Sequence, residues 1–591
     1  MEEDVIFSDP PRSVEGADLD YLPYNYLPAA LSAIANDSSA QSRIVMTFPK
    51  PQSDAARLDY GAVFTAIHPE LLRHPGETAA FLRGLQDEIG ADFTPQPWFL
   101  GPPTELRHDT ENKILTLDRT PFELEAETDF TAAVVVIDAG IAFWNRRFQG
   151  PTGPRFQAIR FLDFDLPVGT PPSKTRLTYE EIKDICKYAE AGGDADRRIV
   201  ACLRERFPGS FYGSAAAEDV DGLWHGSAMA DLAAGDSGKK VALFGLELPT
   251  KMVEDYSGDT LANSMLTVLE AALMMTASIQ SVPVIILLPY AFTGGPQDGT
   301  HPAAEIIRTF LAVPGRAGLN IVVSAGNLLQ GRLRARLPGT TNAGARMNLD
   351  WWVPPDDFSP NTVEAIIENV SSMNGRASLD VKAPTNIDAA VSGLTEGQSR
   401  DLIRRGAVIG SIVRFKNIGT TARLRLSLHP TGYAGKPVTA PHGRWELSTP
   451  STQHADLWVL RDDRDSLFDR EYPHRQSHFA HQLYRPTNKV GAPRLDDDPG
   501  SPVMRSGTLS PLGTAVGVSV VQANEKLGIG LPQQAEYSGR PDVGAVLTLQ
   551  QALVDDGYPE RGEPASANGT DRRMRVSGTS SAAALYVRSI T

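Results

Sequence analysis

Four polar residues of this chain lie where a strand or a helix is expected to begin or end. Asp138 closes the apolar run TAAVVVIDAG, and Asn327 closes LNIVVSAGN. His225 begins the small-residue segment HGSAMADLAAG, and Ser580 lies in the last stretch, VSGTSSAAALYVRSIT. Together they supply a nucleophile, a base to take its proton, a carboxylate to orient the imidazole and a donor for an oxyanion. Acyl transfer requires these four groups.

Each of the four also has a purely structural interpretation. A serine in front of an alanine-rich segment is a good helix N-cap, which would account for Ser580. His225 could be a surface histidine or a satisfied core histidine. Asp138 could be a strand-end turn residue, and Asn327 an ordinary turn former. The presence of all four, each on a suitable element, favours the reactive interpretation.

The elements that would position these residues alternate along the chain. Strand, helix, strand, helix is the pattern of an α/β fold with a doubly wound, mostly parallel sheet. In such a sheet, polar residues at the carboxyl ends of the strands gather at one edge. The apolar strand candidates are residues 131–140, 239–248, 282–290, 319–327 and 514–523, and the helix candidates are 259–280 and 301–313.

The segments VVVIDAGI, HGSAMADLAAG, SAGN and SGTSSAA, in this order, resemble the motifs of the subtilisin-like serine proteases. The resemblance covers about residues 131–330 and 500–591, with a large insertion between them. It implies that Asp138 orients His225 and that His225 deprotonates Ser580. It also implies that Asn327 and the Ser580 backbone N–H hold the oxyanion. The expected activity is that of a serine endopeptidase acting on a protein or peptide.

The same resemblance implies a substrate-binding edge made of two short segments. Because proline has no N–H and tyrosine is bulky, Pro289 and Tyr290 would alter the edge along which a peptide pairs. We therefore expect selective cleavage and not broad digestion. The residues of this edge are Leu288, Pro289, Tyr290 and Ala291 in one segment and Ser324, Ala325 and Gly326 in the other.

The sequence divides into regions of different texture. Residues 1–125 are rich in proline and acidic groups, with an apolar run at 44–48 and a plausible helix at 76–90. This region could be an inhibitory propeptide, as in many subtilisin-like proteases, or a permanent recognition domain. The catalytic domain is expected in two parts, 126–345 and 501–591.

A β-rich insert is expected between the two catalytic parts, at residues 346–500. In ARLRLSL, Leu424, Leu426 and Leu428 alternate with Arg423, Arg425 and Ser427, which predicts a strand. With VIGSIVRFK and the turn Asn417-Ile418-Gly419 before it, this strand would form a hairpin. The insert resembles the jelly-roll-like additions of some subtilisin-like proteases and could hold a partner protein. Residues 462–508 are expected to be loop.

Composition excludes several classes of function. The net charge of −16 opposes binding to nucleic acid, because there is no basic excess to replace phosphate counterions. Residues 271–292 are too often interrupted by polar residues and Pro283 to predict a membrane span. The start, MEEDVIFSDPPRS, lacks the features of a signal peptide. Cys186 and Cys202 are interpreted as buried thiols, and a cytoplasmic location is expected.

No cofactor is predicted. The histidines of the 462–508 region lack fixed ligand spacing and are interpreted as parts of a solvated loop. LDDDPGSP is interpreted as a turn; calcium is common among subtilisin-like proteases, but no ligand set stands out here. The residues considered as metal ligands are His474, His478 and His481, with Asp462 and Asp463 nearby.

A second function remains open from the sequence. The chain could be a catalytically weak or inactive protein of the subtilisin-like fold that binds or scaffolds a partner through its β insert. Ser581 directly after Ser580, and the pair Pro289 and Tyr290, motivate this alternative.

Overall fold

The computed structural model describes short N-terminal segments at 5–7, 12–13, 22–23, 44–47 and 96–99 and most of 130–591. Its longest gaps after residue 130 are 164–174, 339–347 and 462–474. Contacts divide the chain into two units, which we call the β unit and the α/β unit. The β unit comprises Met1–Asn112, Thr293–Pro296 and Gln330–Thr508, and the α/β unit comprises Lys113–Phe292, Gln297–Leu329 and Leu509–Thr591.

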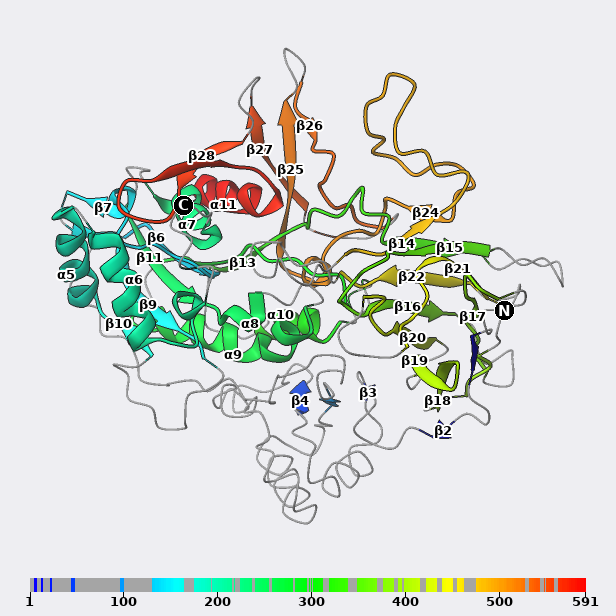
Figure 1. Cartoon of the computed structure of the whole chain (residues 1–591). Coiled ribbons are helices and arrows are strands. Elements are labelled where there is room, and N and C mark those ends of the chain that lie inside the picture. Colours follow the sequence, from blue (N-terminus) through cyan, green and yellow to red (C-terminus); the bar gives the residue numbers. More distant parts are fainter. Residues whose placement is uncertain are drawn as a thin grey trace, which may run out of the picture. The chain divides into compact units, whose positions relative to one another are not determined.

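A nine-stranded sheet forms the centre of the α/β unit (Figure 1). All its pairings are parallel except those of β10 and β26 at the two ends of the strand order. The expected parallel sheet is therefore present. The order is β10 (Arg176–Leu177), β9 (Phe156–Phe161), β11 (Val241–Glu247), β6 (Ala132–Asp138), β12 (Val284–Leu288), β13 (Leu319–Ser324), β25 (Ser519–Lys526) and β26 (Gln533–Gln534), with β27 (Leu549–Asp556) also paired with β25.

Helices cover both faces of this sheet (Figure 1). α7 (His225–Ala234) packs with α11 (Thr579–Ile590) over one face, and α9 (Asp259–Met275) packs with α10 (Pro302–Leu311) over the other. Because both faces are covered, the central strands are buried throughout, which is why they appear in the sequence as continuous apolar runs. α9 is shorter than expected and ends at Met275, where the Thr276 hydroxyl donates to the Leu273 carbonyl.

The two cysteines lie on neighbouring helices in different environments. Cys186, on α5 (Tyr179–Glu190), is buried, and burial raises the pKa of its thiol to about 11. Cys202, on α6 (Ala195–Arg206), is exposed, so its interpretation as a buried thiol is wrong. The inward face of α6 is formed by residues such as Ile199 and Leu203, and Cys202 points away from them.

No helix in the described part of the chain is long and apolar enough to cross a membrane.

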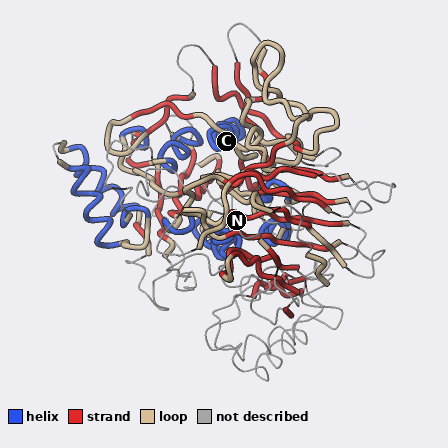
Figure 2. Tube along the Cα trace, turned by 45° about the vertical axis from the view of Figure 1, so that its right-hand side comes forward, coloured by secondary structure: helices blue, strands red, loops and turns tan. Residues whose placement is uncertain are grey.

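The described part of the β unit consists of strands and loops (Figure 2), and its strand pairings are antiparallel. The larger sheet has the order β1 (Ile6–Phe7), β18 (Gln398–Arg404), β19 (Ala407–Arg414), β20 (Ala422–Leu428), β16 (Asn361–Ile367), β22 (Ala455–Val459), β14 (Arg334–Leu337) and β24 (Val503–Met504), with β2 (Arg12–Ser13) also on β18. The second sheet has the order β17 (Asp380–Lys382), β21 (Gly443–Ser448), β15 (Asn348–Val353) and β23 (His478–Ala480), and a third has the order β3 (Leu22–Pro23), β5 (Gln96–Phe99) and β4 (Ile44–Thr47).

The predicted hairpin is formed by β19 and β20. Its leucines and arginines alternate as expected, but the arginine face is buried as well as the leucine face. The buried charge of Arg425 is matched, because its guanidinium donates to Glu364 on β16 at 2.6 and 2.9 Å.

Other sequence predictions lie outside the described residues: the helix at 76–90, the turn at 417–419, and His474, Asp462 and Asp463.

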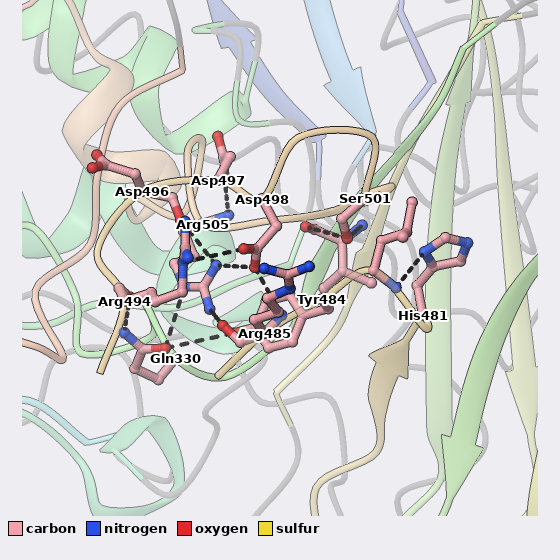
Figure 3. A network of polar contacts seen from close by, with 12 residues as sticks. Gln330, His481, Tyr484, Arg485, Arg494, Asp496, Asp497, Asp498, Ser501 and Arg505 are labelled. Carbon is pink, nitrogen blue, oxygen red and sulfur yellow. Dashed lines mark hydrogen bonds and ion pairs between the residues drawn. The ribbon is translucent and has the colours of Figure 1, made fainter. Parts of the chain in front are cut away.

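A long loop between β23 and β24 is held by the buried guanidinium of Arg505 (Figure 3). Arg505, whose side chain is 0% exposed, donates to the carbonyls of Asp496 and Arg485 and to the carboxylate of Asp498. It also lies over the Tyr484 ring, 4.2 Å from its centroid. Within the region expected to be loop, the described residues therefore include the two short strands β23 and β24, and the irregular stretch between them is ordered by side-chain contacts.

We predict that Arg505→Met destabilises the β unit by about 3–5 kcal/mol, because it removes the buried cationic partner of Asp498 and the donor to the carbonyls of Asp496 and Arg485. Hydrogen–deuterium exchange should then accelerate across residues 481–500. Arg494→Met is the matched control, since Arg494 contacts the same carboxylate with a side chain that is 30% exposed and should lose less than about 1 kcal/mol. Equal losses of stability in the two variants would contradict the role of Arg505 in holding this loop.

Candidate active site

The side chains of Asp138 and His225 meet at the carboxyl end of β6. His225 Nδ1 lies 2.7 Å from Asp138 Oδ2. Asp138 Oδ1 accepts a 2.8 Å hydrogen bond from the backbone N–H of Ala139. With a proton on Nδ1 shared with the carboxylate, Nε2 is left as a proton acceptor. The His225 side chain is 42% exposed, so this nitrogen can be reached. The pair has the arrangement of a general base with its orienting carboxylate.

Asp138 also sets the pKa of His225. Loss of hydration alone would lower that pKa, but the charge of Asp138 and its hydrogen bond to the ring act in the opposite direction and prevail. The pKa of His225 therefore lies above its ordinary value of 6.5. A higher pKa makes the imidazole a stronger base once it is deprotonated.

α7 starts directly on the turn that follows Asp138, which explains why the pair meets. The N–H groups of Gly226 and Ser227 donate to the carbonyls of Ala139 and Gly140 at 2.9 and 3.0 Å. A Cβ on Gly226 would come within 2.7 Å of the Ala139 carbonyl oxygen, so only glycine fits there. The small residue after His225 is thus required by the close approach of helix and turn.

Glu247, which the sequence analysis did not single out, holds the other side of the same turn. It is the last residue of β11 and pairs with Asp138 in register. Its buried carboxyl group accepts the N–H groups of Gly140 and Ile141 at 3.0–3.1 Å. The signal in the sequence is a single carboxylate at the end of the apolar run KKVALFGLEL. Burial raises the pKa of Glu247 to about 8, against the opposing effect of the two N–H donors.

Ser580 lies in the first turn of α11, as expected. Its hydroxyl donates to the backbone carbonyl of Pro289 at 2.8 Å. Among the described residues, this is the hydrogen bond that the hydroxyl makes, and none joins it to His225. The alanines that follow, Ala582 to Ala584, are fully buried, so α11 packs closely on the core. Since Pro289 follows β12 and β12 pairs with β6, Ser580 lies at the same sheet edge as Asp138.

Asn327 contacts the turn immediately before Ser580. Its Oδ1 accepts hydrogen bonds from the Thr579 backbone N–H and hydroxyl, both at 2.9 Å. The Thr579 hydroxyl in turn accepts the N–H of Gly326 at 3.0 Å. With Oδ1 occupied, Nδ2 is the donor end of the amide, and it makes no hydrogen bond to a residue that the structure describes. A Cβ on Gly578 would lie only 3.3 Å from Nδ2, so this turn leaves little room for a side chain.

The two segments expected to bind substrate continue from neighbouring strands. Leu288 ends β12 and Ser324 ends β13, and these strands pair in parallel. Beyond them, the methyl group of Ala291 would lie 3.4 Å from a Cβ on Gly326. The Tyr290 hydroxyl donates to the carbonyl of Met252 at 3.4 Å.

Within the described ranges, no group of three or more His, Cys, Asp or Glu residues is placed to hold a metal ion.

The buried carboxyl of Glu247 predicts a pH-dependent stability. Between its unfolded pKa near 4.5 and its folded pKa of about 8, the folded protein keeps a proton that the unfolded chain has lost. Stability from this group is therefore complete below pH 4.5 and is lost as pH rises through 8. In Glu247→Gln, the fall in unfolding free energy between pH 5 and 8 should be smaller by on the order of a few kcal/mol. Denaturant unfolding at a series of pH values measures this, and identical slopes in both proteins would contradict it.

Comparison with known proteins gives a likeness of fold. No protein-family model and no curated protein sequence matches the chain. Among solved structures, the chain is similar to the Clostridium perfringens CspB protease, with a TM-score of 0.52 and 16% sequence identity. The similarity covers 78% of this chain and 81% of that chain. At this identity, the comparison shows that the chain has a mixed α/β fold shared with a protease.

Proposed function

We propose that this chain is a selective serine endopeptidase that cleaves peptide bonds through an acyl-enzyme. The observation that carries the proposal is the 2.7 Å contact between His225 and Asp138, at the sheet edge where Ser580 contacts Pro289. The order of the motifs, which resembles that of the subtilisin-like proteases, supports it. The fold shared with a protein described as a protease supports it as well.

In the proposed first half-reaction, His225 Nε2 takes the hydroxyl proton of Ser580 as its Oγ attacks the carbonyl carbon of the substrate. Asp138 stabilises the resulting imidazolium. The carbonyl oxygen becomes an oxyanion and receives hydrogen bonds from Asn327 Nδ2 and the Ser580 backbone N–H, favoured by the N-terminus of α11. Collapse of this intermediate breaks the C–N bond, and the imidazolium protonates the leaving amine. An ester between Ser580 and the substrate acyl group remains.

In the second half-reaction, a water molecule gives a proton to His225 and attacks the ester carbonyl. The oxyanion forms again on the same donors. Its collapse breaks the ester bond, and the imidazolium returns the proton to Ser580 Oγ. The products are a carboxylic acid and an amine, and the enzyme is regenerated.

The first half-reaction requires Ser580 to exchange one hydrogen bond for another. Its hydroxyl donates to the Pro289 carbonyl, so it must give up this bond by a rotation of the side chain before His225 can accept its proton. Rotation between staggered positions is an ordinary side-chain motion. Substrate seated along the Pro289 segment would compete for that carbonyl and favour the rotated position.

The position of the Ser580 hydroxyl also favours the second candidate function, an inactive or weakly active protein that binds or scaffolds a partner. If the bond to Pro289 persisted, the imidazole would have no nucleophile to activate. Chemical reactivity of Ser580 distinguishes the two candidates, and it can be measured without knowing the substrate.

We expect a fluorophosphonate probe to label the wild-type protein on Ser580. Ser580→Ala should abolish labelling, because the phosphorus has lost its nucleophile. Ser581→Ala is the matched control: this neighbouring hydroxyl is buried and donates to the Ser577 carbonyl, and its loss should leave labelling in place. Intact mass and peptide mapping identify the modified residue. A folded wild type that remains unlabelled at every pH would refute the endopeptidase and favour the binding protein.

The rate of labelling should follow the protonation of His225. It should rise with pH through the His225 pKa, since only the neutral imidazole accepts a proton, and the midpoint should lie above 6.5 because Asp138 raises that pKa. Asp138→Asn should move the midpoint down and slow labelling by roughly 10⁴-fold, as loss of the orienting carboxylate does in serine proteases. An unchanged midpoint in this variant would contradict the assigned role of Asp138.

A further inference from the structure

A short segment after β26, residues 535–539, lies against both loops that flank the proposed oxyanion. Its base is fixed to β25, because the Ala535 N–H donates to the Ala523 carbonyl at 2.9 Å. The Ala523 N–H in turn donates to the Ser538 hydroxyl at 3.0 Å. Since Ala523 and Ser538 are both fully buried, the segment has a rigid attachment to the sheet.

From this base, the segment makes one backbone hydrogen bond on each side of Asn327. The Gly539 N–H donates to the Gly326 carbonyl at 2.8 Å. The Leu329 N–H donates to the Tyr537 carbonyl at 3.1 Å. These contacts fix the chain one residue before Asn327 and two residues after it.

The side chain of Tyr537 reaches the other loop, which leads into α11. Its phenol oxygen accepts the N–H of Gly578 at 3.0 Å, two residues before Ser580. Gly578 has φ +113°, a conformation that favours glycine, so this turn is already restricted. The Tyr537 ring is half-buried and packs against the hydrophobic core, which limits its own movement.

We propose that Tyr537 is a positioning residue for the oxyanion hole, an inference that rests on the proposed function. One tyrosine binds both loops: its carbonyl holds the loop of Asn327, and its hydroxyl holds the turn before Ser580. It thereby fixes the separation between the two donors that would bind the oxyanion, Asn327 Nδ2 and the Ser580 N–H. Tyr537 acts through these groups and does not touch the reacting atoms. Because such donors act only when they are placed in advance, a small displacement reduces the rate.

The variant Tyr537→Phe tests this, since it keeps the ring and removes only the hydroxyl. With a fluorophosphonate probe, the maximal inactivation rate should fall roughly ten-fold, which is a tenth or less of the roughly 10²- to 10³-fold loss expected if an oxyanion donor were removed outright. The probe concentration at half-maximal rate should change less than about two-fold, because ground-state binding does not use the oxyanion donors. Tyr188→Phe is the matched control: it removes a phenol hydroxyl that contacts Arg198 on the protein surface, and it should label as the wild type does.

A double-mutant cycle with Asn327→Ala separates positioning from general support of the fold. If Tyr537 acts through the oxyanion hole, Tyr537→Phe should slow labelling less than two-fold once Asn327 is already alanine. A ten-fold loss in both backgrounds, or unchanged labelling of Tyr537→Phe, would overturn the role of Tyr537 and leave the proposed function standing. Absence of labelling in the folded wild type would overturn the proposed function, and the role of Tyr537 with it.

Discussion

The arrangement of the site depends on two backbone hydrogen bonds, from Gly226 and Ser227 at the start of α7 to the turn after Asp138. They let a helix begin on the end of a buried strand, and they require a residue without a side chain at position 226. The pairing of His225 with Asp138 follows from that contact, because it brings the His225 imidazole within 2.7 Å of the Asp138 carboxylate. The hydrogen bond between the side chains is then a consequence of how the backbone packs.

Much of this could be predicted from the sequence, for a physical reason. Strands buried on both faces appear as continuous apolar runs, and the polar residue that ends each run must lie at the sheet edge. That reasoning located β6, β11, β12 and β13, and it identified Asp138 and Asn327 as strand-end residues. It also identified the helix that begins at His225. The bounds were less accurate, as in α9, which ends at Met275.

The missed features share a different property: their partners are backbone atoms or side chains far away in the sequence. Glu247 binds amides more than a hundred residues before it, and Tyr537 binds an amide forty-one residues after it. Cys202 was misjudged because a helix can turn one cysteine outward while its neighbours face the core. The side-chain order around Arg505 was missed for another reason: Asp498 and Arg485 lie only 7 and 20 residues away, but the pattern of that region is charged and irregular and does not single them out.

The proposed base and the proposed oxyanion donors are held by separate parts of the sheet. Glu247 and the start of α7 fix the turn after Asp138, whereas the segment 535–539 is attached to β25 and fixes the turns around Asn327 and Gly578. α7 and α11 pack on one another and are the helical link between the two sides. Because Ser580 lies at the start of one helix and His225 at the start of the other, their separation depends on how these helices pack. The buried alanines of α11 allow that packing to be close, so the small residues around Ser580 matter for its distance from His225 as well as for the helix itself.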